Sequence, residues 1–175
     1  MDIKSHIRTI PHYPKKNIMF RDVSSLLQDA VGFGSSINEL AKRYAAMEID
    51  KVVGIEARGF IVGAPLAYAL GKGFVPIRKK GKLPAETVGQ DYDLEYGSDR
   101  IEIHIDSIAR GERVLLADDL IATGGTAEAA TKLIEKIGGK IIECCFIIDL
   151  PDVGGRGRLE KQGYSVFSLC EFAGT

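Results

Sequence analysis

Short β-rich runs alternate with helical patterns along most of this chain, and this alternation restricts the fold more than any other feature. The apolar runs 51–55, 113–117 and 140–149 are typical of strands, and 126–138 has the apolar spacing of a helix. Strands that alternate with helices form a mainly parallel sheet with helices on its faces. We therefore expect one α/β domain over residues 1–175, with a twisted, mainly parallel sheet flanked by helices.

Two regions interrupt this pattern. Residues 100–106 alternate between apolar and polar, which predicts a half-exposed strand paired through Gly97 with the preceding segment 92–96. Residues 79–91 contain Gly, Pro and charge without periodicity, and such a connection in a compact domain is typically a functional lid or a disordered segment. We expect a flexible lid loop and a β-hairpin over 79–105.

The composition excludes several classes of protein. The formal net charge is −1, which argues against a surface built to coat nucleic acid. No run of about 18 apolar residues is present and the first residues lack the apolar core of a signal peptide, so we expect no membrane span and a cytoplasmic protein. The cysteines and histidines show no metal-ligand spacing, and packing is the expected role of Cys144, Cys145 and Cys170.

The most informative motif is RVLLADDLIATGGT at 113–126, a strand followed by a short loop and a helix. Ligands of open parallel sheets bind beyond the carboxyl ends of the strands, where this loop must lie. Gly124 and Gly125 let the backbone approach an anion, Thr123 and Thr126 offer hydroxyl donors, and the following helix contributes its positive end. The spacing matches neither a Walker A loop nor a dinucleotide fingerprint. It predicts a cradle for one phosphate group.

Two acids, Asp118 and Asp119, come at the end of the strand, just before the predicted cradle. Adjacent carboxylates would repel a phosphate, so the ligand must offer hydroxyls or a bound cation on that side. A ribose 5-phosphate meets both demands, with its 2′- and 3′-hydroxyls donating to the acids. The simpler alternative is that the acids cap the next helix, which needs only one of them.

Basic residues follow two other strands. Arg58, in GIEARGF, can present a guanidinium to a second anion, or can be a surface residue paired with Glu56. Arg78, Lys79 and Lys82 belong to a basic run that is either a solvated face or the site of a strongly anionic leaving group. No aromatic residues interleave this run, which disfavours a nucleic-acid surface.

The segment VLLADDLIATGGT closely resembles the 5-phosphoribosyl-1-pyrophosphate (PRPP) binding motif of type I phosphoribosyltransferases, where a hydrophobic run, an acid pair and Thr-Gly-Gly-Thr follow in fixed order. YPKKNIMFRDVSSLL, GIEARGF, IRKKGKLPAET and YDLEYGSDRIEIH are similar to the adenine-specific branch of that family. The resemblance runs from about residue 7 to about residue 172. It implies the type I phosphoribosyltransferase fold with a small N-terminal hood, expected over 1–35.

The resemblance also implies an activity, a cofactor and an assembly. The activity is a purine-salvage step in which adenine and PRPP give AMP and pyrophosphate. Mg²⁺ is the expected cofactor, held mainly by PRPP and water rather than by side chains, and a homodimer is the expected assembly. The PRPP and AMP site is implied to consist of Asp118, Asp119, Ala122, Thr123, Gly124, Gly125 and Thr126. The pyrophosphate site is implied to contain a cis Glu56–Ala57 peptide bond and to consist of Glu56, Ala57, catalytic Arg58, Arg78, Lys79 and Lys82.

Further roles are implied for the lid and the hood. Glu95 is implied to be catalytic and to move a proton of the bound purine, with Tyr96 lining the site. From the residues alone, a surface strand residue facing Arg100 is the simpler interpretation of Glu95. The residues implied to border adenine, by stacking and backbone hydrogen bonds, are Met19, Phe20, Arg21 and Ala122. A role of Phe20 as a core anchor stays open beside that interpretation.

Three alternatives remain. Another purine phosphoribosyltransferase, such as one for xanthine, would share the PRPP motif and bind a different base. A PRPP-sensing regulatory protein would keep the fold without the chemistry, but no DNA-binding segment is appended to this chain. A receiver-like signalling domain would explain the acid pair but not the Thr-Gly-Gly-Thr loop.

Overall fold

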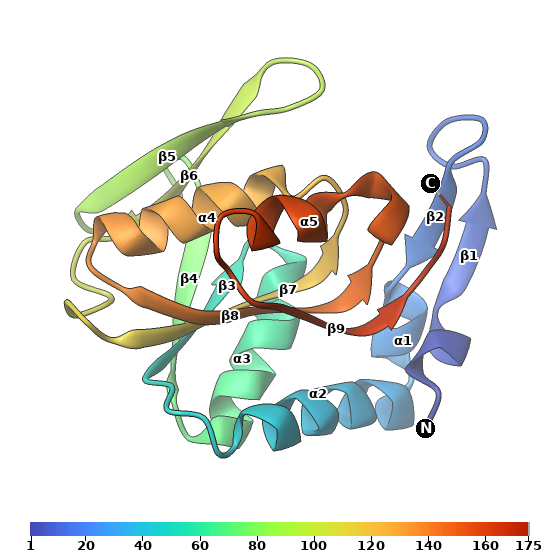
Figure 1. Cartoon of the computed structure of the whole chain (residues 1–175), viewed down its shortest axis with the longest axis horizontal. Helices are drawn as coiled ribbons and strands as arrows, with labels where there is room; N and C mark the ends of the chain where they lie inside the picture. The colour runs from blue at the N-terminus through green and yellow to red at the C-terminus, as the bar shows by residue number, and fades with distance from the viewer. Residues whose placement is uncertain (175) are drawn as a thin grey trace.

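The computed structural model describes residues 1–174 and has a central sheet with helices on both faces (Figure 1). The sheet strands are β3 (Lys51–Ile55), β4 (Gly73–Lys79), β5 (Thr87–Asp93), β6 (Ser98–His104), β7 (Arg113–Ile121), β8 (Lys140–Asp149) and β9 (Val166–Glu171). The helices that cover it are α2 (Ala30–Tyr44), α3 (Arg58–Leu70), α4 (Gly125–Lys136) and α5 (Gly155–Glu160). The strand order is β5-β6-β4-β3-β7-β8-β9. Strands β4, β3, β7, β8 and β9 are parallel, which confirms the predicted fold class.

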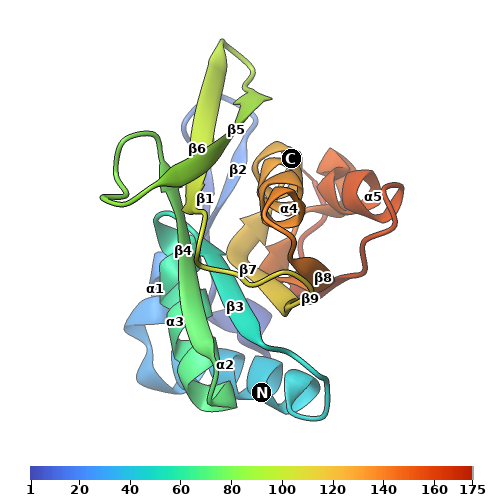
Figure 2. The same ribbon diagram turned by 90° about the vertical axis from the view of Figure 1, so that its left-hand side faces the viewer.

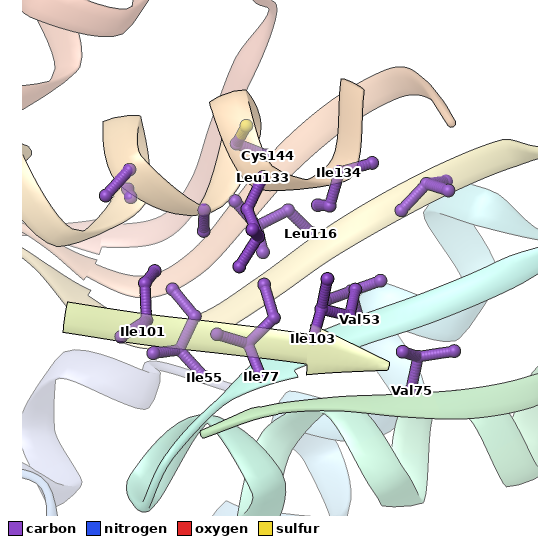
Figure 3. Packing of buried hydrophobic residues seen from close by; sticks show 14 of the residues in the cluster. Val53, Ile55, Val75, Ile77, Ile101, Ile103, Leu116, Leu133, Ile134 and Cys144 are labelled. Carbon is purple, nitrogen blue, oxygen red and sulfur yellow. The ribbon is translucent and has the colours of Figure 1, made fainter. Parts of the chain in front are cut away.

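Two hydrophobic clusters hold the layers together, one on each face of the sheet. On the α4 face, Leu116 of β7 and Leu133 of α4 are fully buried and belong to one cluster (Figure 3). On the α2 and α3 face, Leu40, Leu66 and Leu115 belong to the other. Burying a side chain of this size stabilises the fold by about 1.5–3 kcal/mol, so the layers position the strand ends firmly.

Strand β7 extends further than its sequence predicts. The expectation that the strand ends at the acid pair is wrong, because β7 continues to Ile121 and α4 begins at Gly125. Strand β7 extends beyond the acid pair because it is hydrogen-bonded to neighbouring strands. Strand β3 pairs with β7 as far as Ala117, and β8 pairs with it up to Ile121, opposite Asp149. The acids therefore sit in ordered strand backbone rather than in a loop.

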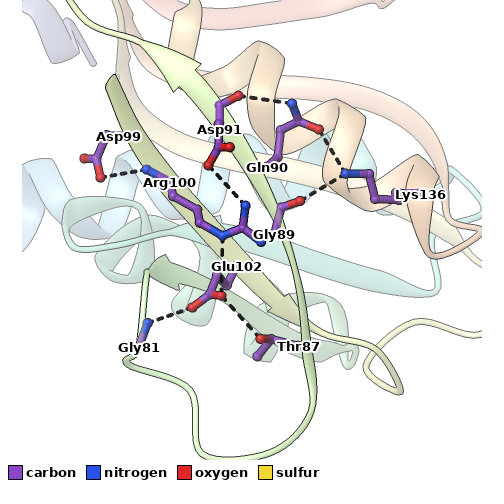
Figure 4. A network of polar contacts seen from close by, with 9 residues as sticks. All are labelled: Gly81, Thr87, Gly89, Gln90, Asp91, Asp99, Arg100, Glu102 and Lys136. Carbon is purple, nitrogen blue, oxygen red and sulfur yellow. Dashed lines mark hydrogen bonds and ion pairs between the residues drawn. The ribbon is translucent and has the colours of Figure 1, made fainter. Parts of the chain in front are cut away.

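The segment 79–91 is more regular than its composition predicts. Lys79 ends β4 and Thr87 begins β5, so only the residues between them are irregular, and the expectation of an aperiodic connection is wrong for 87–91. Partly polar β5 is a strand because it pairs along its whole length with β6, whose Ile101 and Ile103 are buried. Arg100 of β6 contacts Asp91 and Glu102 within this hairpin (Figure 4).

The β5–β6 hairpin projects from the sheet on a narrow attachment (Figure 2). Its pairs with β4 are Arg78 with Glu102 and Lys79 with Ile101. At the far end, the turn is closed by a 2.9 Å hydrogen bond from the Leu94 N–H to the Gly97 carbonyl, and Gly97 has a φ of 84°. The tip, residues 94–97, is therefore at the opposite end of the hairpin from its attachment at Ile101 and Glu102.

The N-terminal residues form a separate small layer of η1 (Ile3–His6), β1 (Arg8–Pro11), β2 (Met19–Asp22) and α1 (Ser24–Gln28). Strands β1 and β2 pair antiparallel and form their own two-stranded sheet. The C-terminal residues return to this layer, where Arg21 donates to the Ala173 carbonyl at 3.1 Å. Within residues 1–174, no helix has the length and apolar character that a membrane crossing requires.

Candidate active site

A cavity of about 400 Å³ opens at the carboxyl ends of β3 and β7. It brings together five segments of the chain, 55–58, 79, 92, 101 and 118–127. The predicted residues that line it are Glu56, Ala57, Arg58, Lys79, Asp118, Asp119, Ala122, Thr123, Gly124, Gly125 and Thr126. Those outside its lining are Met19, Phe20, Arg21, Arg78, Lys82, Glu95 and Tyr96.

The loop after β7 has the geometry of an anion cradle. Gly124 is the N-cap of α4 with a φ of 81°, and no side chain caps this helix end. The first N–H groups of the helix have no intrahelical partner, so they remain available to an anion, which the helix dipole also favours. A Cβ on Gly124 would lie 2.9 Å from the Gly155 carbonyl oxygen, so both conformation and space require glycine.

Gly155, at the start of α5, packs against this loop. This contact was not predicted from the sequence. Its N–H donates to the Ala122 carbonyl at 2.9 Å, and a Cβ on Gly155 would lie 2.4 Å from that same oxygen. The start of α5 therefore packs directly against the predicted cradle. Only the crossing of two distant segments produces this contact, so no local signal in the sequence could have predicted it.

The two acids of β7 have different surroundings. Asp119 is 5% exposed and its Oδ2 lies 2.6 Å from Nε of Arg58. The Asp119 N–H also donates to Oδ1 of Asp118 at 2.9 Å. Burial, reinforced by the charge of Asp119, raises the pKa of Asp118 well above its ordinary value. The pair thus combines one ion-paired carboxylate with one that readily takes a proton, an arrangement suited to a neutral, hydroxyl-bearing ligand.

The turn between β3 and α3 presents Glu56 and Arg58 to the cavity, and the Glu56–Ala57 peptide bond is cis, as the resemblance implies. Glu56 accepts from the Lys79 N–H at 2.9 Å and pairs with Arg78 at 3.3 Å. The Lys79 N–H, with Arg78, lowers the pKa of Glu56 against the opposing effect of burial. The predicted alternative, a surface pair of Arg58 with Glu56, is wrong because Arg58 pairs with Asp119 instead.

The hairpin tip stands outside the cavity. Glu95 is exposed and Tyr96 is 80% exposed. The Nζ atom of Lys15, in the loop between β1 and β2, lies 5.6 Å from the centroid of the Tyr96 ring. Arg100 pairs with Asp91 and Glu102, so the expected contact between Glu95 and Arg100 is absent among the ion pairs of residues 1–174.

The hood residues of β2 also lie outside the cavity. The guanidinium of Arg21 lies 4.5 Å from the Phe172 ring centroid and donates to Thr9 Oγ1 at 2.6 Å. Its side chain therefore joins the hood to the C-terminal residues. The ring of Phe20 packs edge-on against Tyr13 with centroids 5.1 Å apart.

Several cavity residues were missed at the level of sequence. Tyr92 of β5 and Ile101 of β6 reach the cavity because the hairpin folds beside it, and the remaining ones adjoin predicted residues: Ile55, Leu120, Ile121 and Ala127. The alternation of 100–106 could have placed Ile101 on the inner face. Tyr92 follows a segment of mixed polarity without alternation, so the sequence did not indicate that its side chain faces the cavity. No group of three His, Cys, Asp or Glu side chains in residues 1–174 is arranged to hold a metal ion.

Comparison with known proteins places this geometry in one family. The model of the phosphoribosyl transferase domain matches residues 25–172. An adenine phosphoribosyltransferase of Nitrosospira multiformis is 69% identical, over 99% of this chain and 99% of its own length. The crystal structure of the adenine phosphoribosyltransferase from Thermoanaerobacter pseudethanolicus has a TM-score of 0.91 at 50% identity, covering 97% of this chain and 98% of its own. That from Saccharomyces cerevisiae has a TM-score of 0.89 at 38% identity, with 96% of each chain covered.

Proposed function

The chain belongs to the adenine phosphoribosyltransferases, and from that premise we propose how the residues of its cavity divide the reaction among them. It is a purine-salvage transferase that attaches a phosphoribosyl group to adenine. The structures of the Saccharomyces cerevisiae and Giardia lamblia relatives are complexed with adenine and with 9-deazaadenine respectively, which supports a purine base as the acceptor here. PRPP is the donor, so AMP and pyrophosphate are the products.

The donor occupies the cavity with its 5-phosphate on the loop Ala122–Thr126 and its ribose hydroxyls on Asp118 and Asp119. The loop offers uncapped N–H groups, and the oxygens of half-buried Asp118 and buried Asp119 accept hydroxyl hydrogens. Arg58 and Lys79 line the cavity on the side of β3 and β4, where they bind the pyrophosphate, and the turn Glu56–Ala57 shapes that side. Arg78 and Lys82 are outside the cavity lining and approach the same pyrophosphate group from the rim of the cavity.

The reaction takes place at the anomeric carbon of the ribose. The bond from this carbon to the pyrophosphate oxygen breaks, a ring nitrogen of adenine forms the new bond, and the proton of that nitrogen passes to Glu95. Positive charge develops on the ribose as the leaving group departs, as in glycoside hydrolysis. Catalysis therefore depends on alignment of the base, neutralisation of the leaving group and exclusion of water, without a covalent nucleophile.

The hood and the hairpin complete the base site. Met19, Phe20 and Arg21 border adenine together with Ala122, and the hairpin, with Glu95 and Tyr96 at its tip, closes over the bound base. The contact of Lys15 with Tyr96 supports this arrangement, because it already brings the hood loop and the hairpin tip together. Closure would exclude water, which otherwise attacks the same carbon. We propose residues 1–35 as the hood and 79–105 as the lid.

Mg²⁺ enters with PRPP in this proposal, with PRPP and water as its main ligands. Carboxylate oxygens are the ligands that Mg²⁺ prefers in proteins, so the ion-paired carboxylate of Asp119 would hold a water molecule of such an ion. When bound, Mg²⁺ would supply positive charge that offsets part of the negative charge of the leaving pyrophosphate.

A homodimer in the cytoplasm is also part of the proposal. Ile61 and Tyr68 of α3 are 41% and 90% exposed, and the same helix begins at Arg58, so a partner covering this face would lie close to the cavity. Basic residues of the partner would then approach the pyrophosphate. Sedimentation equilibrium is the test, and a monomer at micromolar concentration would contradict it.

The observation that carries the assignment is the meeting of the acid pair, the Gly-Gly loop and Arg58 in one cavity. The test is a spectrophotometric assay with PRPP, Mg²⁺ and adenine, guanine, hypoxanthine or xanthine, each alone. We expect turnover with adenine only. Turnover with xanthine instead would identify a different base specificity, and PRPP binding without turnover would identify a sensor.

A further inference from the structure

A three-residue contact at the hairpin is left unexplained by the proposed reaction. Nζ of Lys79 donates to the hydroxyl of Tyr92 at 3.0 Å and also to the carboxylate of Asp99. Lys79 and Tyr92 line the cavity, whereas Asp99 does not. Asp99 therefore touches the cavity only through other residues.

Strand register brings the three residues together. Tyr92 and Asp99 are directly opposite each other in the β5–β6 hairpin, and Lys79 is opposite Ile101. Asp99 and Ile101 are two positions apart on β6 and so share one face of the strand. The contact thus lies where the hairpin attaches to the sheet, and any movement of the hairpin relative to β4 alters it.

The contact leaves hydrogen-bonding capacity for a ligand. A lysine ammonium has three N–H donors, of which Tyr92 and Asp99 take two, so one remains for an anion in the cavity. The second oxygen of Asp99 accepts from the Arg100 N–H at 2.7 Å, which fixes the carboxylate (Figure 4). Partial burial opposes the charged form of Lys79, but the hydrogen bonds to Asp99 and Tyr92 outweigh it and raise the pKa of Lys79.

The other basic residues near the cavity have partners of a different kind. Arg58 pairs with Asp119 and Arg78 pairs with Glu56, and both of these carboxylates line the cavity themselves. A substrate that reaches those arginines meets their carboxylates as well. Lys79 differs, because Asp99 stands outside the cavity lining and can keep its contact while Lys79 binds a ligand.

We propose that Asp99 is a positioning residue that holds the Lys79 ammonium, with Tyr92, against the pyrophosphate group of PRPP. The proposal rests on the proposed function of Lys79 as a pyrophosphate ligand. It predicts that Asp99 acts on PRPP and pyrophosphate binding through Lys79, and that it has no direct effect on adenine.

The test compares Asp99→Asn, Lys79→Met and the double variant, with steady-state kinetics and calorimetric titration of PRPP in the presence of Mg²⁺. Asp91→Asn is the matched control, since Asp91 is in the same hairpin and pairs with Arg100 rather than with Lys79. Circular dichroism and a thermal melt of each variant verify folding. Asp99→Glu tests rescue by a residue that keeps the charge.

We expect Asp99→Asn to raise the KM and Kd for PRPP about tenfold, consistent with the loss of one charge-assisted hydrogen bond. The KM for adenine and the kcat at saturating PRPP should change less than about twofold. In the Lys79→Met background the same substitution should have little further effect, and Asp99→Glu should recover part of the affinity.

Unchanged or tighter PRPP binding by Asp99→Asn would overturn the proposal, because Asp99 would then be only a neighbouring negative charge. An equal effect of Asp99→Asn with and without Lys79 would overturn it too. If Lys79→Met itself leaves PRPP binding unchanged, the assigned role of Lys79 fails and the role of Asp99 fails with it. If PRPP binding is lost in Lys79→Met but is unchanged in Asp99→Asn, the positioning role of Asp99 is refuted and the proposed function of Lys79 remains.

Discussion

Arg58 at the start of α3 and Asp119 near the end of β7 form an ion pair, with Nε of the arginine 2.6 Å from Oδ2 of the aspartate. The proposed reaction assigns the arginine to the pyrophosphate and the aspartate to the ribose. Before substrate binds, the two groups therefore satisfy each other, so that neither leaves an uncompensated charge in a partly buried cavity. In the proposed reaction, binding of PRPP would replace this one contact between protein groups with two contacts to the ligand.

The acid pair can be tested by the double substitution Asp118→Asn and Asp119→Asn. We expect PRPP affinity, measured by calorimetry, to fall about 100-fold or more, because the hydrogen bonds that the ribose hydroxyls donate to the two acids are weakened. The fold should persist, since asparagine has the shape of aspartate and burial already favours the neutral form of Asp118. Exposed Asp106→Asn is the control, and unchanged PRPP affinity of the double variant would remove the acids from the site.

The phosphate loop can be tested with Gly124→Ala. The φ of 81° and the Gly155 carbonyl 2.9 Å from the new Cβ both oppose any side chain, so we expect the free energy of unfolding to fall by about 2 kcal/mol. Affinity for AMP should fall at the same time, because the loop must move to relieve the contact. Gly157→Ala in α5, where a Cβ would meet nothing within 4 Å, is the control. Wild-type stability and AMP affinity in Gly124→Ala would contradict the loop geometry.

The proton transfer assigned to Glu95 can be tested with Glu95→Gln. We expect kcat to fall by about 10²–10⁴-fold if this transfer is rate-determining, while PRPP affinity stays unchanged. Folding should be unaffected because Glu95 is exposed at the hairpin tip. Glu86→Gln, an exposed residue of the irregular segment before β5, is the control. A rate within a few-fold of wild type would take Glu95 off the list of catalytic residues.

Glu143 of β8 is buried and accepts hydrogen bonds from Arg43, Tyr44 and Ser165, so we expect it to contribute to stability in acid. Burial alone would raise the pKa of Glu143, but these hydrogen bonds outweigh it and lower the pKa below its ordinary value of 4.5. A carboxyl with a lowered folded-state pKa stabilises the protein above its unfolded-state pKa, and this stabilisation is lost as the pH falls through the folded-state value.

Glu143→Gln should therefore reduce the free energy of unfolding by about 2 kcal/mol at pH 7, and the difference from wild type should shrink below the ordinary pKa of Glu143. Urea unfolding at a series of pH values measures both effects. Glu160→Gln removes the same charge from a pair with Arg156 in which the glutamate side chain is 49% exposed, and it should cost less than about 1 kcal/mol. A difference between Glu143→Gln and wild type that stays constant with pH would contradict the linkage.

Much of the fold and of the phosphate loop could be predicted because their signals are local. Strand, acid pair, loop and helix follow one another within 113–126, and the run 140–149 is apolar enough to be a central strand, β8. The hairpin itself was predicted, but residues 87–91 of β5 could not be predicted as a strand in this way, because they are too polar to show a period. Its structure comes from pairing with β6.

The sequence by itself determined the fold class, the alternation of the main strands and helices along the chain, and the loop that we propose binds the phosphate, because apolar periodicity and glycine positions act over a few neighbouring residues. Only the tertiary structure decided which acid meets which base. Arg58 had Glu56 close by in the chain and pairs with Asp119, while Lys79 pairs with Asp99 across two strands. Opposite charges attract without regard to sequence, so their pairing follows from strand register and helix placement, which arise from burial of the core on both faces of the sheet.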